Sequence, residues 1–395
     1  MTDSDTNDAQ ARAHSERLQA VIRSEIETAD VRAIPFWRFM ELALYAPGLG
    51  YYSAGATKFG AAGDFVTAPE LGPLFAECVA EAVAPVLGQL GPDAHFLEVG
   101  GGSGRFAADA ITRLAQMDAM PARYAILEPS ADLRERQGEY LRQRLTKAQF
   151  ARVQWLDGPP QDEWNGVLFA NEVIDALPTP RFAMRDGEVM EEYVGHEDGR
   201  GFVRVDRPAD ALLAAAVRHV ERQLPEPFAQ GFRSELLPQL PYWIQAVIGG
   251  LRDGAMLFVD YGFARSEYYL PQRSDGTLRA FHRHTVSGDV LARPGLQDLT
   301  ASVDFTALAE AGTGAGFEFA GYCSQAAFLI GNGLDRRLAA HEAGAADEAA
   351  LYTLRQQAKQ LTVPGAMGEG FQAMGFARGV DFDHAFLAGD LSHRL

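Results

Sequence analysis

The sequence has little cysteine and no long apolar run. Only Cys78 and Cys323 occur among its 395 residues, far apart, so neither a disulfide framework nor a CxxC zinc pair is expected. No stretch approaches the roughly 18 uninterrupted apolar residues of a membrane span. The first 16 residues are polar and carry acids, unlike a signal or transit peptide. We therefore expect a cytoplasmic protein in a reducing compartment.

Positive charge is also scarce. Lys and Arg total 35 against 53 Asp and Glu, which gives a formal net charge of −18. An excess of this size repels nucleic acid and anionic membrane, so we expect neither as a partner. A protein substrate with a basic surface fits this charge. The sequence does not decide between a monomer and a homodimer. The composition, 47% hydrophobic and 22% charged, is that of a globular chain.

Short apolar runs alternate with helical patterns in the middle of the chain. This alternation predicts an α/β fold, in which a Rossmann-like parallel sheet carries helices on both faces. The predicted strands are HFLEVG (95–100), RYAILEPS (123–130), VQWLDG (153–158), GVLFANE (166–172) and AMLFVDYG (255–262).

The pattern changes between the fourth and fifth of these strands. Residues 181–205 contain two turn signals, Asp186-Gly187 and Asp198-Gly199, which predict an antiparallel meander. A helical stretch follows, so we expect 181–250 to be an inserted subdomain. Residues 264–300 are polar and irregular, which is long for a structureless loop and typical of a substrate-covering segment.

The N-terminal part predicts helices after a tail. We expect residues 1–15 to be disordered and an amphipathic helix to follow from Glu16, because Leu18, Ile22 and Ile26 recur at a spacing of four. Thr67 and Glu70 form the pattern of a capping box before a second apolar helix. The expected divisions are 1–15 (tail), 16–92 (helical region with a covering loop), 93–180 (core, first part), 181–250 (insert) and 251–395 (core, second part).

A glycine loop follows the first predicted strand. The segment from Glu98 to Gly104, EVGGGSG, fits the loop of an S-adenosylmethionine site through Glu98, Gly100, Gly102 and Gly104. The segment from Gly102 to Ala107 also fits the dinucleotide fingerprint GxGxxA. A carboxylate here would oppose a pyrophosphate but suit the cationic groups of S-adenosylmethionine. We therefore favour S-adenosylmethionine, with a dinucleotide or a structural turn as the alternatives.

Two acids follow the second and third strands. Glu128 lies 24 residues past Gly104, near the position at which an acid grips ribose hydroxyls. Its alternative role is an exposed acid at the end of a strand. Asp157 could accept a hydrogen bond from an adenine amino group, or simply form the turn before Gly158.

A polar segment follows the fourth strand. Asn171, Glu172 and Asp175 are expected beside the reacting methyl, because ligands lie beyond the carboxyl ends of the strands in open α/β sheets. The alternative for Asp175 is a helix cap. Asp260 and Tyr261 end the fifth strand and could add an acid and a phenol to the substrate side.

One histidine pair suggests a metal. His282 and His284 form an HxH pattern in the irregular segment. No third ligand stands at a telling spacing, so we expect solvated or hydrogen-bonding histidines and no metal.

Seven motifs stand in order along the chain: LYAPGLGYYS (44–53), GAAGDFVTAPEL (60–71), LEVGGGSGR (97–105), FANEVIDALP (169–178), VDYGF (259–263), DGTLRAFHRH (275–284) and DLTASVDF (298–305). Together they resemble the MidA-like methyltransferases, a family that includes the mitochondrial complex I assembly factor that methylates an arginine. The resemblance runs from about Ala33 to Arg378. It implies a class I S-adenosylmethionine-dependent fold, with Glu98, the loop glycines and Glu128 at the cofactor, and a possible protein-arginine substrate.

We therefore expect an S-adenosylmethionine-dependent methyltransferase that modifies a side-chain nitrogen of a protein, with arginine favoured. The GDFVT segment, which ends at Thr67, and residues 264–300 are expected to wall the cofactor. Two alternatives remain: a small-molecule O- or N-methyltransferase, and a cofactor-binding assembly factor that acts mainly through protein contacts.

Overall fold

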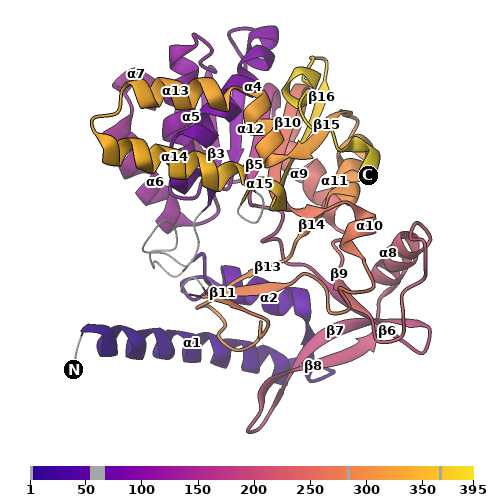
Figure 1. The fold of residues 1–395 in the computed structure, drawn as a ribbon. Coiled ribbons are helices and arrows are strands. Elements are labelled where there is room, and N and C mark those ends of the chain that lie inside the picture. Colours follow the sequence, from indigo (N-terminus) through magenta and orange to yellow (C-terminus); the bar gives the residue numbers. More distant parts are fainter. Residues whose placement is uncertain (1–2, 54–66, 283–284, 364–366) are drawn as a thin grey trace. The chain divides into compact units, whose positions relative to one another are not determined.

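The chain forms two compact units (Figure 1). The computed structural model describes residues 3–53, 67–282, 285–363 and 367–395. Unit 1 comprises the described residues of Met1–Phe65, Asp175–Gln239 and Arg265–Ser302, and unit 2 those of Val66–Ile174, Leu240–Ala264 and Val303–Leu395.

An eight-stranded sheet is the centre of unit 2. Its order is β15-β16-β10-β5-β2-β3-β4, with β14 beside β10. The strands from β10 to β4 are parallel to one another. Strand β16 is antiparallel to β10, and β15 is antiparallel to β16. This confirms the five predicted strands and the Rossmann-like fold. The bounds are β2 His95–Val99, β3 Arg123–Leu127, β4 Val153–Leu156, β5 Glu163–Asn171, β10 Gly250–Phe263, β14 Val303–Asp304, β15 Glu318–Ser324 and β16 Phe371–Arg378.

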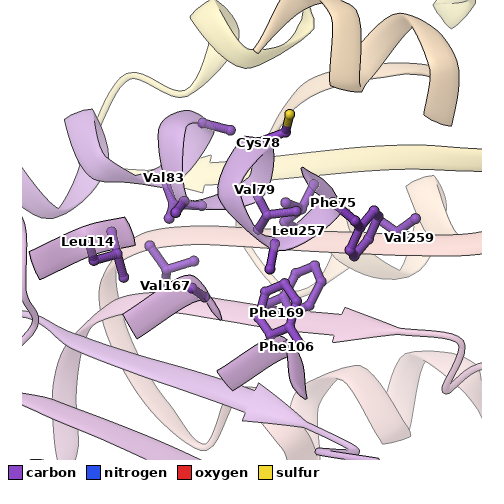
Figure 2. Packing of buried hydrophobic residues seen from close by; sticks show 14 of the residues in the cluster. Phe75, Cys78, Val79, Val83, Phe106, Leu114, Val167, Phe169, Leu257 and Val259 are labelled. Atoms are coloured by element: carbon purple, nitrogen blue, oxygen red, sulfur yellow. The ribbon is translucent and has the colours of Figure 1, made fainter. Parts of the chain in front are cut away.

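Helices cover both faces of this sheet because side chains alternate along each strand. On one face, Phe106 of α5 stacks on Phe169 of β5 with ring centroids 4.3 Å apart, and Phe75 of α4 joins them (Figure 2). On the other face, Phe258 contacts Phe376, against which α11 packs. These helices span α4 Leu74–Leu90, α5 Arg105–Gln116 and α11 Phe305–Gly314.

Several helices after β15 were not predicted. Helices α13 and α14 bury few side chains, such as Leu334, Ala358 and Leu361, so their apolar stripes are too narrow to stand out in the sequence. The remaining helices of unit 2 are α3 Ala68–Leu71, α6 Ala131–Arg144, α7 Lys147–Phe150, α9 Leu240–Ile248, α12 Gln325–Gly331, α13 Leu334–Ala343, α14 Glu348–Thr362, α15 Met367–Gly370, η1 Asp383–Phe386 and η2 Ser392–Arg394.

The predicted meander belongs to a five-stranded sheet in unit 1. Strands β6, β7 and β8 follow each other through the predicted turns, and Asp186 and Gly187 adopt positive φ values of 51° and 81°. Two further strands, β1 and β9, complete the sheet from distant parts of the sequence. The bounds are β1 Ala33–Pro35, β6 Arg181–Arg185, β7 Glu188–Glu197, β8 Gly201–Pro208, β9 Arg233–Glu235 and α8 Ala211–Glu221.

A buried ion network ties this sheet to the DGT motif at 275–277. Arg181 is 1% exposed and pairs with Glu192 and Glu235 at 2.9 Å and with Asp275 at 3.0 Å. Thr277 donates its backbone N–H to Glu235 at 2.7 Å. The network fully pairs a buried guanidinium, as burial of a charge requires.

The expected disordered tail is wrong from Asp3 onward. Helix α1 spans Asp3–Thr28 without a break, and α2 spans Phe36–Tyr45. The predicted apolar stripe is buried, and Ser15 anchors the helix by donating to the carbonyl of Pro294 at 3.0 Å. Ala9, Ala11 and Ala13 precede this anchor, and alanine is the residue that most favours a helix. Among the described residues, no helix has the length and apolar character needed to cross a membrane.

Residues 264–300 are more regular than expected. They contain the short helix α10 and a three-stranded antiparallel sheet of order β12-β11-β13. These strands are only three or four residues long, too short to show a period of two in the sequence. The bounds are α10 Arg265–Tyr268, β11 Arg279–His282, β12 Thr285–Ser287 and β13 Asp298–Thr300.

Candidate functional site

The glycine loop joins the carboxyl end of β2 to the start of α5. Gly100, Gly102 and Gly104 have φ values of 74°, 51° and 83°, in the left-handed region that favours glycine. A Cβ atom on Gly100 would meet Cγ2 of Val173 at 2.9 Å. The loop therefore lies against the turn that follows β5, and only a residue without a side chain allows this approach.

Helix α3 anchors the loop. The carboxylate of Glu70 accepts a hydrogen bond from the hydroxyl of Ser103 and pairs with Arg105 at 3.2 Å. The expected capping box is wrong, because Thr67 makes no side-chain cap and α3 has only four residues. Glu70 serves the loop rather than the helix. The GDFV residues before Thr67, predicted to cover the cofactor, lie outside the described residues.

Glu128 lies at the end of β3 within a polar network. It is 5% exposed, and its carboxylate accepts from the N–H of Ser130 at 3.0 Å and from Gln137 at 3.4 Å. The same Gln137 amide donates to the carbonyl of Gly102 at 2.9 Å and accepts from Trp155 at 2.8 Å. Gln137 thus ties the glycine loop to Glu128. No sequence signal distinguished it from the other polar residues of its helix.

Asp157 occupies the predicted edge of the sheet. Its side chain is 98% exposed and pairs with Arg134 at 2.6 Å. Arg134 also donates to the carbonyls of Leu156, at 2.8 Å, and Glu128. The arginine joins the ends of β3 and β4, and an adenine contact by Asp157 stays a prediction.

Glu98 is a buried acid beneath the loop. It is 2% exposed and accepts from the hydroxyl of Tyr124 at 2.8 Å. Burial raises the pKa of Glu98 to about 8, although the hydrogen bond from Tyr124 opposes this rise. Without a cationic ligand, the group is therefore mostly protonated at neutral pH. The expected fixed negative charge at Glu98, which would oppose a pyrophosphate, is therefore wrong for the protein without a ligand.

The turn after β5 is strained. Glu172 has a φ of 52°, uncommon for a residue with a side chain, and its N–H donates to the carbonyl of Val259 at 2.9 Å. Its carboxylate accepts from the side-chain amide of Asn171 at 3.1 Å. The buried Oδ1 of Asn171 accepts no hydrogen bond from the described residues. These side chains stand at the predicted edge, next to the loop.

Asp260 differs from its predicted role as a rim acid. It is 1% exposed and accepts from the N–H of Ile174 at 3.1 Å and of Tyr261 at 2.9 Å. It therefore fastens the turn after β5 to the end of β10. Tyr261 is half-buried and packs edge-on against Phe371, with ring centroids 5.4 Å apart.

Asp175 belongs to unit 1 and is 5% exposed. The alternative that it caps a helix is wrong, because turns and then β6 follow it. Its backbone carbonyl accepts from the N–H of Ala301 at 2.9 Å. Nearby, Tyr52 donates to Asp298 at 2.9 Å, and burial raises the pKa of this phenol well above its ordinary value.

Of the two predicted histidines, only His282 lies in the described part of the chain. Its Nδ1 is 2.6 Å from the carbonyl oxygen of Leu296. Within the described residues, no group of three or more His, Cys, Asp or Glu could hold a metal ion.

Comparison with known proteins decides the family. Residues 78–323, more than half of the chain, match a family described as "Putative S-adenosyl-L-methionine-dependent methyltransferase". The chain belongs to this methyltransferase family. The resemblance to MidA-like enzymes is thereby confirmed, as is the expected S-adenosylmethionine cofactor.

Solved and curated relatives agree with this family. A crystal structure from Burkholderia thailandensis bound to S-adenosyl-homocysteine is 41% identical to the methyltransferase over 98% of both chains, with a TM-score of 0.90. "Protein arginine methyltransferase NDUFAF7, mitochondrial" of Danio rerio is 27% identical and covers 85% of this chain and 81% of its own. Its Drosophila melanogaster homolog is 28% identical over 88% and 82%.

The residues of unit 2 fit this cofactor. The glycine loop with its three left-handed glycines ends at the start of α5, where the backbone N–H groups of a helix N-terminus would face the ligand. Glu128 would offer its carboxylate oxygens to the ribose hydroxyls, and Oδ1 of Asn171, which accepts no hydrogen bond from the described residues, would accept one from an ammonium group. No phosphate-binding cation is needed in this arrangement.

The affinity of the methyltransferase for S-adenosyl-homocysteine should depend on the protonation of Glu98. A bound ammonium favours the carboxylate, so a proton must leave at any pH below the pKa of about 8. Calorimetric affinity should therefore rise with pH, by up to about tenfold per unit, and level off above pH 8. Glu98→Gln controls for titration of the ligand itself. If wild type and Glu98→Gln share one pH profile, Glu98 does not face the cation.

Proposed function

We propose that the methyltransferase transfers the methyl group to a side-chain nitrogen of a protein, with arginine as the favoured acceptor. The strained Glu172 carries this proposal. A residue with a side chain is held at positive φ at a cost of roughly 1–3 kcal/mol, and such residues cluster at functional sites. The names of the curated relatives and the net charge of −18 support a basic protein substrate.

The chemistry asks for an acid at this place. When bound, S-adenosylmethionine supplies an electrophilic methyl group and a neutral thioether as the leaving group. A guanidinium stays protonated at neutral pH, so an acceptor arginine would repel the cationic cofactor. Glu172 would pair with the guanidinium, orient one nitrogen and take the proton that this nitrogen loses.

The test uses a lysate of cells that lack the protein. With radiolabelled S-adenosylmethionine, the wild type should label a protein, and acid hydrolysis should release methylarginine. Glu172→Gln keeps the shape but removes the charge. It should bind S-adenosyl-homocysteine normally and incorporate at least about a hundredfold less label, the smaller end of a general-base contribution. Label found only in small molecules would refute a protein acceptor, and wild-type incorporation by Glu172→Gln would refute its role.

A further inference from the structure

Gln372 lies at the same edge of the sheet as the candidate site. Strand β16 is antiparallel to its neighbours, so its first residues stand where the parallel strands end. Gln372 pairs with Asp260 of β10 on one side and with Ser324 of β15 on the other. It is 8% exposed. No motif in the sequence pointed to this position.

The orientation of its amide group is set by the protein. Nε2 of Gln372 donates to the carbonyl of Glu369 at 2.8 Å. The reverse orientation would set two oxygens against each other, so the remaining atom is Oε1, an acceptor. This oxygen is buried and receives no hydrogen bond from the described residues. A buried acceptor without a donor is costly, and at this edge of the sheet a bound ligand would supply the donor.

The position of Gln372 connects it to the turn after β5, which carries Glu172. Residues that pair across neighbouring strands point to the same face, so Gln372 lies beside Asp260. Asp260 in turn holds the N–H of Ile174, two residues after Glu172. The unpaired oxygen therefore stands next to the carboxylate that fixes the turn.

We propose that Gln372 binds the methyl acceptor, with Oε1 accepting a hydrogen bond from an N–H group of the substrate. Together with the carboxylate of Glu172, the oxygen of Gln372 gives this edge hydrogen-bond acceptors, which selects a ligand rich in donors. A guanidinium fits, because it carries five N–H donors and no acceptor. The proposal rests on the proposed function and adds a specificity-determining residue to it.

A matched control is present in the chain. Gln325 is 0% exposed, its Nε2 donates to the carbonyl of Leu361 at 3.2 Å, and its Oε1 also lacks a donor among the described residues. It starts α12, beyond β15, and so lies outside the pair formed by β16 and β10. Gln372→Met and Gln325→Met remove the same amide at two buried positions.

The experiment measures lysate-dependent formation of S-adenosyl-homocysteine at several lysate dilutions. Gln372→Met should need at least tenfold more lysate for half-maximal rate, with affinity for S-adenosyl-homocysteine within twofold of wild type. Gln325→Met should match wild type in both. The retained affinity for S-adenosyl-homocysteine shows that Gln372→Met folds, which guards against a loss through misfolding.

The outcomes separate the two proposals. Product formation with label only in small molecules refutes the protein substrate, while the ratio between variants still reports on Gln372. An unchanged lysate requirement for Gln372→Met, or equal losses for Gln372→Met and Gln325→Met, overturns the role of Gln372. No lysate-dependent product from the wild type overturns both.

Discussion

Replacement of Arg181 by methionine should lower the free energy of unfolding by about 3–5 kcal/mol. The substitution removes the guanidinium shared by Glu192 and Glu235, which are 0% and 1% exposed. Glu192 keeps its ion pair with Arg233 at 3.0 Å, so Glu235 is the carboxylate that loses its cation. Burial alone would lower the pKa of Arg181, but these carboxylates and Asp275 raise it above its ordinary value, so the guanidinium stays charged. The loss is large because the buried carboxylate of Glu235 is left without the cation that compensates its charge.

Denaturant unfolding with a probe in unit 1 measures this effect. Arg185→Met is the matched control, since Arg185 pairs with Asp206 at 2.9 Å but is 46% exposed. An exposed pair contributes at most about 1 kcal/mol, so this control should stay near wild type. Equal losses in both variants would show that burial of the Arg181 network does not govern its contribution.

Glu128→Ala should weaken binding of S-adenosyl-homocysteine by about 1.5–3 kcal/mol, which corresponds to a ten- to 150-fold rise in Kd. Hydrogen bonds to a charged group are worth this much, and the buried carboxylate of Glu128 is held by Ser130 and Gln137. Because these bonds already fix the Glu128 side chain, ligand binding does not have to pay the entropy of ordering it.

Isothermal titration calorimetry gives the comparison. Glu135→Ala is the control, because Glu135 is an exposed acid on the following helix and its loss changes the net charge equally. It should leave Kd within about twofold. If Glu128→Ala also stays within twofold, Glu128 is only an acid at the end of a strand.

Local patterns in the sequence identified the parts of the fold that depend on local rules. The buried strands of unit 2 read as short apolar runs, and the turn at Asp186-Gly187 needs residues that tolerate positive φ. The loop from Gly100 to Gly104 was recognisable for the same reason. The fold class and the cofactor followed from these signals.

Contacts between residues far apart in the chain could not be predicted from the sequence. Glu70 resembled a helix cap, but it binds Ser103, 33 residues away. Gln137 and Gln372 looked like ordinary polar residues, because nothing local shows that their amides are buried and directed. The pairing of β1 with β7 was equally invisible, since a three-residue strand carries no periodicity.

Burial also changed the meaning of residues that were identified correctly. Glu98 was expected to act as a fixed charge, yet desolvation raises its pKa to about 8. Asp260 was expected at an open rim, yet it holds two backbone N–H groups at 1% exposure. Charge and accessibility depend on the surroundings, which a residue's position in the sequence does not report.

We expect the carboxyl edge of the unit 2 sheet to bind the cofactor, with the turn at 171–174 facing the methyl acceptor. Amide hydrogen exchange with and without S-adenosyl-homocysteine tests this claim directly, because bound segments open less often. The account predicts slower exchange on binding in three segments, the glycine loop at 100–104, residues 128–130 and the turn at 171–174. Unchanged exchange in all three, with protection confined to unit 1, would contradict it.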